Sequence, residues 1–327
     1  MGLLFIFEAS NSNLNTMNIQ FRNGDSMPLI GLGTYLSKPE EVKQAVITAV
    51  KNGYRHIDCA AIYENETVIG EALQEIFDQG IVKRDELFIT SKLWNSNHAP
   101  EHVEAALRKT LQDLRLDYVD LYLIHWPVAF RYGVKFPSGI EEFVSLEELP
   151  LTETWKAMEL LVPKGLCKHI GVSNFSEKKL RDLMAIATIK PEMNQIELHP
   201  YLQQNELVSF CQDNDIHVTA YAPLGSHRLI NDEKGLTHEP IILAIAKKHL
   251  CTPAQVLLAW GMKRKEVVIP KSVNPQRIIE NFRSLTVPLD ETDMEQIATL
   301  DRHMRTTDAT FWELEGGSYT ARGIWDE

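Results

Sequence analysis

Four side chains suited to proton transfer lie at the ends of short apolar runs in this sequence. They are Asp58, Tyr63, Lys92 and His125, within the contexts YRHIDCAAIYENE, LFITSKLWN and VDLYLIHWP. The apolar runs are typical of buried parallel strands. In a barrel of parallel strands the carboxyl ends all open on one rim, where such folds carry out chemistry. We therefore expect an acid, a phenol, an ammonium and an imidazole to form one proton-donating site for a carbonyl.

The phenol of Tyr63 is the candidate general acid of this site. A free phenol has a pKa of about 10 and gives up its proton reluctantly at neutral pH. A neighbouring Lys92 ammonium is expected to lower that pKa, with Asp58 holding the lysine in place. His125 can donate a hydrogen bond to the carbonyl oxygen, where negative charge grows during reduction. Proton donors alone reduce nothing, so the site also needs a hydride carrier.

Each of the four residues also has a purely structural explanation when taken alone. Asp58 and Lys92 can be an ion pair that only stabilises the fold, and Tyr63 can be a half-buried packing residue. His125 can be a core histidine with satisfied hydrogen bonds. Their joint placement at successive strand ends favours the functional interpretation.

The rest of the chain alternates between strand-like and helix-like patterns. The eight strand-like runs are Leu29–Gly33, His56–Asp58, Leu87–Ser91, Val119–His125, His169–Val172, Met193–Leu198, His217–Ala222 and Val267–Ile269. The helical patterns include Pro39–Asn52, Glu66–Gln79, Pro100–Leu114, Leu151–Val162, Ser176–Ala187, Gln204–Asp213 and Glu239–His249, and Thr252-Pro253 starts another. Eight strand–helix pairs are the number found in a (β/α)8 TIM barrel.

A doubly wound α/β sheet has the same repeat but usually begins with a glycine-rich phosphate turn. The only candidate here, Gly31-Leu32-Gly33, lacks a third glycine and opens no helix, so the barrel is favoured. We expect an N-terminal β-hairpin at MNIQFRNGDSMPLIGLGTY before it. Val128–Pro150 and the tail from Arg302 to Glu327 are long enough to shape a substrate pocket, although a plain surface loop is the alternative for each.

Composition excludes several classes of function. The net charge of -12 argues against general binding to nucleic acid or anionic lipid, and no apolar run reaches the ~20 residues needed to span a bilayer. The cysteines are far apart, without metal-site spacing, so we expect reduced thiols, no metal and a cytoplasmic protein. They are Cys59, Cys167, Cys211 and Cys251. We expect residues 1–16 to be a disordered extension and 17–327 to be a single domain, as a monomer or a homodimer.

The sequence resembles the aldo-keto reductase superfamily from about Met17 to its end. The blocks that carry the resemblance are GLGTY, GYRHIDCAAIYENE, ITSKLWN, DLYLIHWP, IGVSNF, NQIELHPYLQQ, AYAPLGS and IPKSVNPQRIIENF. The resemblance implies a (β/α)8 barrel that reduces aldehydes and ketones with NADPH, without metal or flavin. It also implies that Asp58, Tyr63, Lys92 and His125 are the catalytic residues.

The same resemblance implies a cofactor site. Ser173, Asn174 and Gln195 match residues that bind the nicotinamide carboxamide, and Tyr221 matches the ring that stacks on the nicotinamide. The other matching positions are Thr34 (in GLGTY), Ala222, Leu224 and Ser226 (pyrophosphate segment), Lys271, Ser272, Val273, Asn274 and Arg277 (2′-phosphate), and Glu280 and Asn281 (adenine).

The substrate pocket is expected to be aromatic. Tyr35, Trp94 and Trp126 match family pocket positions beside His125, and many relatives carry Trp where this chain has Tyr35. Further candidates from the long segments are Phe130, Phe311 and Trp312. The tail ends in GGSYTARGIWDE, unlike the better-known animal aldose reductases, so no particular substrate is carried over; small carbonyls, including open-chain aldoses, fit the class.

Two other functions compete with carbonyl reduction. A Schiff-base aldolase would use Lys92 as its nucleophile, since barrel lysines do such chemistry. A non-catalytic, nucleotide-binding barrel subunit would keep the cofactor motifs alone. The cofactor motifs disfavour the aldolase, and the complete catalytic set disfavours the non-catalytic subunit.

The 2′-phosphate motif generates a prediction about cofactor choice. Lys271 and Arg277, with Ser272 and helix N-terminal amides, suit a phosphate dianion. Replacing both cations by Ala should raise the apparent KM for NADPH far more than that for NADH, as measured by steady-state kinetics with each cofactor. An equal effect on both cofactors would contradict the assignment.

Overall fold

A computed structural model describes residues 18–226 and 235–327 of the chain. Its centre is an eight-stranded parallel sheet in the order β12-β11-β10-β9-β6-β5-β4-β3. The two edge strands meet, because the amide of Gly31 donates to the Val268 carbonyl (2.9 Å) and the Val268 amide donates to Leu29 (2.8 Å). The sheet therefore closes, and the expected (β/α)8 barrel is confirmed. Its strands are β3 (Leu32–Gly33), β4 (His56–Asp58), β5 (Phe88–Leu93), β6 (Val119–Ile124), β9 (Cys167–Ser173), β10 (Met193–Glu197), β11 (His217–Tyr221) and β12 (Val267–Val268).

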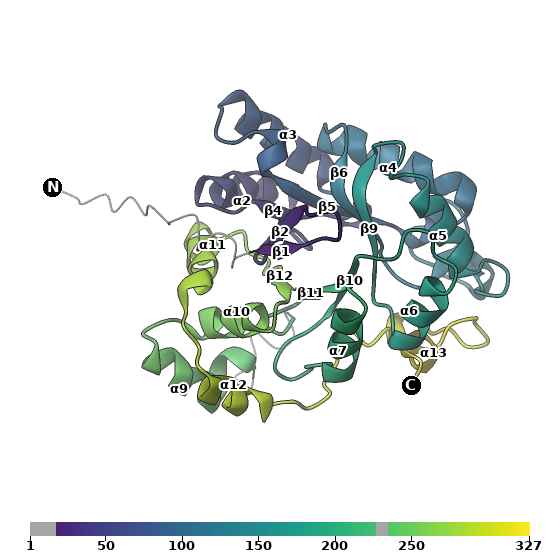
Figure 1. The fold of residues 1–327 in the computed structure, drawn as a ribbon. Helices are drawn as coiled ribbons and strands as arrows, with labels where there is room; N and C mark the ends of the chain where they lie inside the picture. The colour runs from purple at the N-terminus through teal and green to yellow at the C-terminus, as the bar shows by residue number, and fades with distance from the viewer. Residues whose placement is uncertain (1–17, 227–234) are drawn as a thin grey trace.

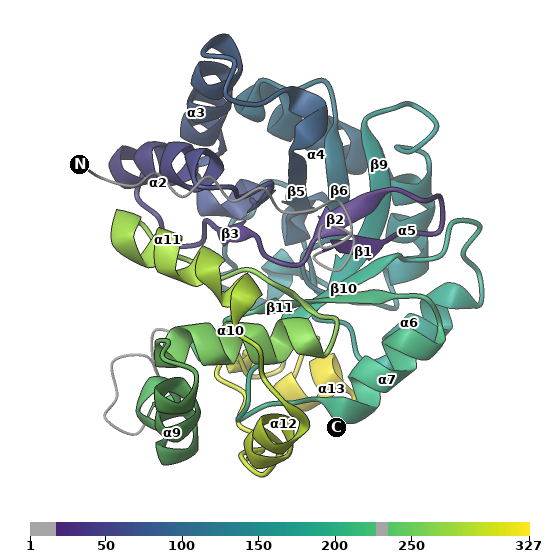
Figure 2. The same cartoon turned by 60° about the vertical axis from the view of Figure 1, so that its left-hand side comes forward.

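Amphipathic helices surround the barrel, as Figures 1 and 2 show. In α2, the fully or nearly fully buried residues Val42, Val46 and Val50 recur every fourth position, which places one apolar face against the strands. The helix α10 starts where the sequence predicts, because Thr252 and Gln255 form a capping box around its first turn. The main helices are α2 (Pro39–Lys51), α3 (Glu66–Asp78), α4 (Pro100–Leu114), α5 (Leu151–Glu159), α6 (Glu177–Met184), α7 (Asn205–Asp213), α9 (Pro240–Lys248), α10 (Pro253–Lys263), α11 (Pro275–Phe282) and α12 (Glu291–Ala298).

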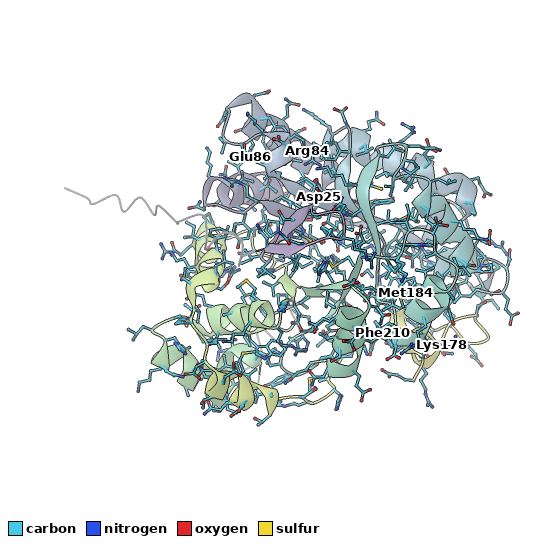
Figure 3. All side chains as sticks on the ribbon, in the orientation of Figure 1. Asp25, Arg84, Glu86, Lys178, Met184 and Phe210 are labelled. Atoms are coloured by element: carbon cyan, nitrogen blue, oxygen red, sulfur yellow. The ribbon has the colours of Figure 1, made fainter. Side chains whose placement is uncertain are left out.

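The expected N-terminal hairpin closes the amino-terminal end of the barrel. Its strands, β1 (Asn18–Gln20) and β2 (Ser26–Pro28), pair antiparallel. Phe21 stacks on the His169 ring at 3.9 Å between centroids, and Arg22 donates to the Asp215 carbonyl at 2.8 Å. Asp25, in the hairpin turn, lies in front of the strands in Figure 3. Because this end is plugged, the carboxyl ends of the strands form the accessible rim.

The two long segments contain more structure than loops. The first holds a small antiparallel pair, β7 (Ala129–Phe130) with β8 (Phe143–Val144). The second holds a short turn, η8 (Thr310–Trp312), and a last helix, α13 (Ala321–Trp325). Figure 1 places α13 beside α6, where Lys179 Nζ lies 2.6 Å from Asp326. The tail is therefore attached to the barrel at its end.

Most predicted boundaries agree with the structure to within three residues. One shift matters for the site, because Lys92 lies inside β5 and not beyond its end. The expected extension at residues 1–16 lies outside the described residues.

All four cysteines are free thiols. Within 18–226 and 235–327 no single helix is long and apolar enough to cross a membrane; only α9 and α10 together pass that test, across a 90° bend.

Candidate active site

The four predicted catalytic residues meet at the carboxyl end of the barrel. Asp58 ends β4, Lys92 lies in β5, and His125 directly follows β6; Tyr63 lies on a short turn, η2 (Ala61–Tyr63), after β4. Lys92 Nζ is 2.5 Å from Asp58 Oδ1 and 3.4 Å from Tyr63 Oη. The rings of Tyr63 and His125 are 5.8 Å apart between centroids. The structure thus brings all four side chains into one site.

The Asp58–Lys92 ion pair is buried and fully hydrogen-bonded. Lys92 is 0% exposed, and its ammonium also donates to the Cys59 carbonyl at 2.8 Å. The other Asp58 oxygen accepts from Gln195 Nε2 at 2.8 Å, and Thr34 Oγ1 donates to the Asp58 backbone carbonyl at 2.7 Å. A buried ion pair is retained at acceptable free energy only when its remaining polar groups are satisfied in this way. The lysine is therefore held in one position beside the phenol.

The pKa of Tyr63 is raised in the structure, whereas the sequence led us to expect that Lys92 would lower it. Burial raises this pKa well above its usual value, and the Asp58 carboxylate raises it further. Desolvation penalises the phenolate, while Asp58 offsets the positive charge of Lys92. In this structure Tyr63 is therefore a protonated phenol, which is the state required of a proton donor.

His125 is held as a neutral imidazole. Burial lowers its pKa well below the usual value, and Lys92 lowers it further. Its Nδ1 has no hydrogen-bond partner among the described residues, and its backbone carbonyl accepts from Asn174 Nδ2 at 3.0 Å. A neutral imidazole can donate one N–H to a carbonyl oxygen without competing with Tyr63 as the acid.

The residues expected to bind a carboxamide form a connected group next to Asp58. Ser173 Oγ donates to the Gln195 carbonyl at 2.8 Å, and Tyr221 Oη donates to Asn174 Oδ1 at 2.8 Å. Asn174 has a left-handed backbone with φ of 63°, a conformation that concentrates at functional sites. Since Gln195 also contacts Asp58, this group and the catalytic residues share one hydrogen-bond network. The donor set fits an amide ligand.

The expected phosphate-binding residues lie where β12 meets α11. Lys271 bridges to Gly33 of the first barrel strand, and Asn274 caps α11 by accepting from the Arg277 amide at 3.0 Å. Burial lowers the pKa of Lys271; Glu41 opposes this effect in part, and the nearby charge of Arg277 adds a smaller lowering. Within 18–226 and 235–327 neither cation has a carboxylate within ion-pair distance. Two adjacent unpaired cations at a helix N-terminus fit a phosphate dianion.

The other expected cofactor residues adjoin these two groups. Ala222, with φ of 48°, opens a turn closed by the Gly225 amide, and residues 227–234 after it lie outside the described residues. Ser272 accepts from the Asn274 amide at 3.1 Å. The remaining positions are Leu224 and Ser226 in that turn, Val273 before α11, and Glu280 and Asn281 within α11.

A cluster of aromatic side chains adjoins the four candidate catalytic residues. Trp94 lies 5.3 Å from the His125 ring, and Trp126 lies 5.5 Å from Phe311 between centroids. Trp312 contacts both tryptophans at 6.0 and 6.1 Å, and its buried indole N–H has no hydrogen-bond partner among the described residues. Phe130, Phe143, Tyr319 and Trp325 are buried in the same cluster. Tyr35, 56% exposed, lies 5.1 Å from the Tyr63 ring at the mouth.

Sequence reasoning missed the residues that hold this pocket together. Tyr319 Oη donates to the Val144 carbonyl at 2.6 Å and accepts from the Ala129 amide at 3.0 Å, so it joins the two long segments. Glu197, two residues after Gln195, accepts hydrogen bonds from the tail. The only available signal was a carboxylate in the otherwise buried strand NQIEL.

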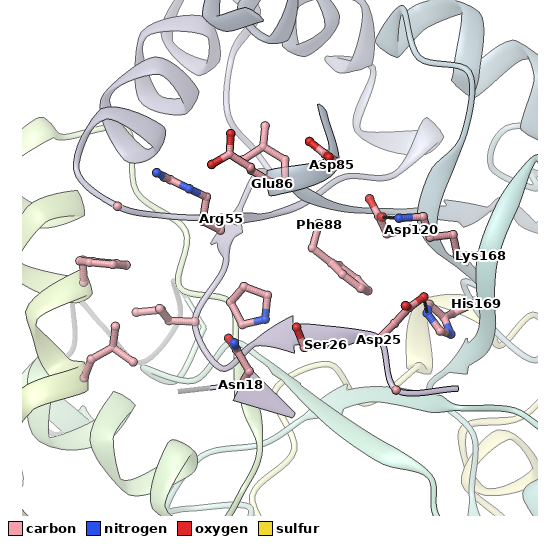
Figure 4. A pocket seen from close by; sticks show the side chains of 17 residues that line it. Asn18, Asp25, Ser26, Arg55, Asp85, Glu86, Phe88, Asp120, Lys168 and His169 are labelled. Carbon is pink, nitrogen blue, oxygen red and sulfur yellow. Dashed lines mark hydrogen bonds and ion pairs between the residues drawn. The ribbon is translucent and has the colours of Figure 1, made fainter. Parts of the chain in front are cut away.

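A separate cavity of about 520 Å³ lies at the opposite end of the barrel, between the hairpin and the segment that includes Arg55 and Phe88 (Figure 4). Its charged side chains include pairs already satisfied within the protein: Lys168 lies 3.0 Å from Asp120, and His169 lies 3.2 Å from Asp25. The amino-terminal face of such barrels serves stability, and catalysis occurs at the other face. The candidate active site is therefore at the carboxyl end of the barrel, where the four predicted proton-transfer residues meet.

Comparisons with known proteins show what this chain resembles. Residues 29–302 match the model of the Aldo/keto reductase family. An aldo/keto reductase of Synechocystis sp. is 49% identical over 97% of this chain and 98% of its own, and the mouse aldo-keto reductase family 1 member A1 is 48% identical over 89% and 91%. The solved structure of the aldose reductase from Schistosoma japonicum superposes with a TM-score of 0.84 at 43% identity, covering 90% of this chain and 95% of that one.

The burial of the Lys92–Asp58 pair predicts a coupled effect on stability. Lys92→Met leaves the Asp58 carboxylate buried without its cation, which should cost about 3–5 kcal/mol of unfolding free energy. The double variant Lys92→Met/Asp58→Asn removes both charges and should recover most of that loss. Urea unfolding of the wild type, both single variants and the double variant measures the coupling. Additive losses in the double variant would show that the two side chains do not stabilise each other.

Proposed function

This chain belongs to the aldo/keto reductase family, and from that membership we propose that it reduces aldehydes and ketones to alcohols with NADPH. The observation that carries the proposal is the contact series from Asp58 through Lys92 to Tyr63, with His125 beside the phenol and the aromatic pocket above it. This arrangement presents a proton donor to a carbonyl in a site largely shielded from water.

The residues divide the proton chemistry between them. NADPH, when bound, would supply the hydride for the carbonyl carbon, and the carbon–oxygen π electrons would move onto the oxygen. His125 donates a hydrogen bond to the carbonyl oxygen and orients it, and Tyr63 gives its proton to the oxygen as negative charge develops. An alkoxide is a far stronger base than a phenolate, so transfer is favourable even from a phenol of raised pKa. Lys92 then stabilises the phenolate until solvent returns a proton.

We assign cofactor binding to the groups that surround this site. Ser173, Asn174 and Gln195 would hold the carboxamide, and the Tyr221 ring would stack on the nicotinamide. Thr34, Ala222, Leu224 and Ser226 would line the middle of the cofactor, and Ser272, Val273, Asn274, Glu280 and Asn281 the adenosine end. Lys271 and Arg277, which have no carboxylate within ion-pair distance among the described residues, support NADPH over NADH, because only NADPH carries the 2′-phosphate.

The aromatic residues indicate the class of substrate, and the cysteines indicate the compartment. Trp94, Trp126 and Tyr35 provide an apolar surface for small carbonyl compounds, with aldoses as a more polar member of that class. The four cysteines are free thiols, which fits a reducing compartment such as the cytoplasm.

The contacts of Lys92 and Tyr63 disfavour the two alternative functions, a Schiff-base aldolase and a non-catalytic nucleotide-binding subunit. A Schiff-base lysine must present a free amine to its substrate, whereas Lys92 is fully buried and donates to Asp58, Cys59 and Tyr63. A non-catalytic subunit would have no reason to retain the complete proton-donating set in contact. Trapping with borohydride and an aldehyde is therefore expected to leave Lys92 unmodified.

The central prediction concerns Tyr63→Phe, which removes only the phenol oxygen. With a panel of aldehydes, the wild type should oxidise NADPH, and Tyr63→Phe should lower kcat by at least about 100-fold while NADPH affinity stays unchanged. Tyr132→Phe is a matched control, because Tyr132 is exposed on the first long segment and should keep full activity. The proposal fails if no aldehyde accelerates NADPH oxidation, or if Tyr63→Phe is as active as wild type.

A further inference from the structure

A second carboxylate at the rim, Glu197, has no part in the proposed proton transfer. It is the last residue of β10 and is 0% exposed. Because side chains alternate along a strand, Glu197 projects on the same side as Gln195, one step closer to the barrel mouth. In the ladder of β10 and β11 it pairs in register with Tyr221. Glu197 therefore stands between the proposed cofactor site and the tail.

Glu197 binds the beginning of the tail through several donors. Its two oxygens accept from the Thr306 amide at 2.9 and 3.1 Å and from the Thr307 amide at 2.7 Å, and one also accepts from the Thr306 hydroxyl. His199 Nε2 donates at 3.0 Å from the strand side. Hydrogen bonds to an ionised acceptor are about twice as strong as neutral ones. Glu197 is therefore a strong attachment for residues 306 and 307.

The ionised state of Glu197 is maintained by these same contacts. Burial alone raises the pKa of its carboxyl group, but the hydrogen bonds from His199, Thr306 and Thr307 outweigh that effect and hold the pKa below its usual value. No ammonium or guanidinium lies within ion-pair distance of Glu197 in the described part of the chain. The tail amides and His199 therefore compensate the buried charge.

The segment that follows this attachment forms one wall of the substrate pocket. Phe311 and Trp312 lie four to six positions after Thr306 and Thr307 and contact Trp126. Further along, Trp325 Nε1 donates to the Asp308 carbonyl at 2.9 Å, and Lys179 holds Asp326. The tail is thus held near both ends. Its Arg302 and Met304 amides donate to the Tyr201 carbonyl at 3.1 and 2.9 Å, and Glu197 holds the residues that come next and lead into Phe311 and Trp312.

We propose that Glu197 is a positioning residue for substrate selection, which holds Thr306 and Thr307 so that Phe311 and Trp312 form the outer wall of the pocket. The inference rests on the proposed carbonyl reductase function. A large aromatic aldehyde reaches this wall, whereas a short aliphatic aldehyde contacts mainly Tyr63 and His125. Loosening the attachment should therefore affect the two kinds of substrate differently.

The test compares Glu197→Gln with wild type on benzaldehyde and propanal. The glutamine amide places an N–H₂ against a tail N–H, so at least one charge-assisted hydrogen bond is lost. The ratio of kcat/KM for benzaldehyde to that for propanal should fall about tenfold, mainly through KM for benzaldehyde. Thr306→Val removes only the hydroxyl donor and should give a smaller change in the same direction.

Glu192→Gln is the matched control. Glu192 is a buried carboxylate that contacts His169 at 2.7 Å immediately before β10, at the opposite end of the barrel. A loss of stability alone would appear in this variant too, but the ratio between the two aldehydes should stay at the wild-type value. A change in ratio as large as that of Glu197→Gln would overturn the positioning role.

A second measurement does not depend on activity. Hydrogen exchange of the peptide containing Thr306 and Thr307 should be slow in wild type and faster in Glu197→Gln, while peptides from β10 stay protected. The proposal would be overturned if the exchange rate of this peptide were unchanged in Glu197→Gln. It would also be overturned if kcat/KM fell equally for benzaldehyde and propanal. If wild type reduces no aldehyde of the panel, the proposed function is wrong, and the exchange result alone decides whether Glu197 anchors the tail.

Discussion

The buried ion pair between Lys92 and Asp58 is the constraint on which the site depends. A single buried charge would be strongly destabilising in the barrel interior, so each of the two side chains needs the other. The remaining hydrogen bonds of the pair run from Lys92 to the Cys59 carbonyl, and from Gln195 and Thr34 to Asp58. The lysine proposed to stabilise a phenolate is thereby held beside the Tyr63 phenol. A looser arrangement would leave the ammonium free to turn toward water.

The register between neighbouring barrel strands brings Lys92 and Asp58 together. In parallel strands β4 and β5, Asp58 lies opposite Thr90, two residues before Lys92, so both side chains project into the same end of the barrel. The strand β10 contributes Gln195 and Glu197 to the same rim. One strand therefore joins the catalytic centre to the segment that covers it, and the tail is part of the site's architecture and not only a surface loop.

The sequence revealed much of this arrangement because the signals are local. Apolar runs ending in Asp58 or His125, and prolines at the starts of α2, α4 and α10, predict the repeat and thus the rim. The pair β7–β8 and the helix α13 were not predicted, since they depend on distant contacts such as those of Tyr319 with Ala129 and Val144. The direction of the Tyr63 pKa shift was also wrong, because burial depends on packing that no local pattern reports.

Proton transfer to a carbonyl oxygen requires that Tyr63 be protonated and held beside Lys92. The most direct test is an NMR titration of the protein with carbon-13 at the tyrosine ring carbon that bears the hydroxyl, with Tyr63→Phe used to assign the signal. Since burial and Asp58 raise the pKa of Tyr63 above the ordinary 10.0, its signal should remain that of a phenol through that pH. A Tyr63 signal that titrates near neutral pH would contradict the account.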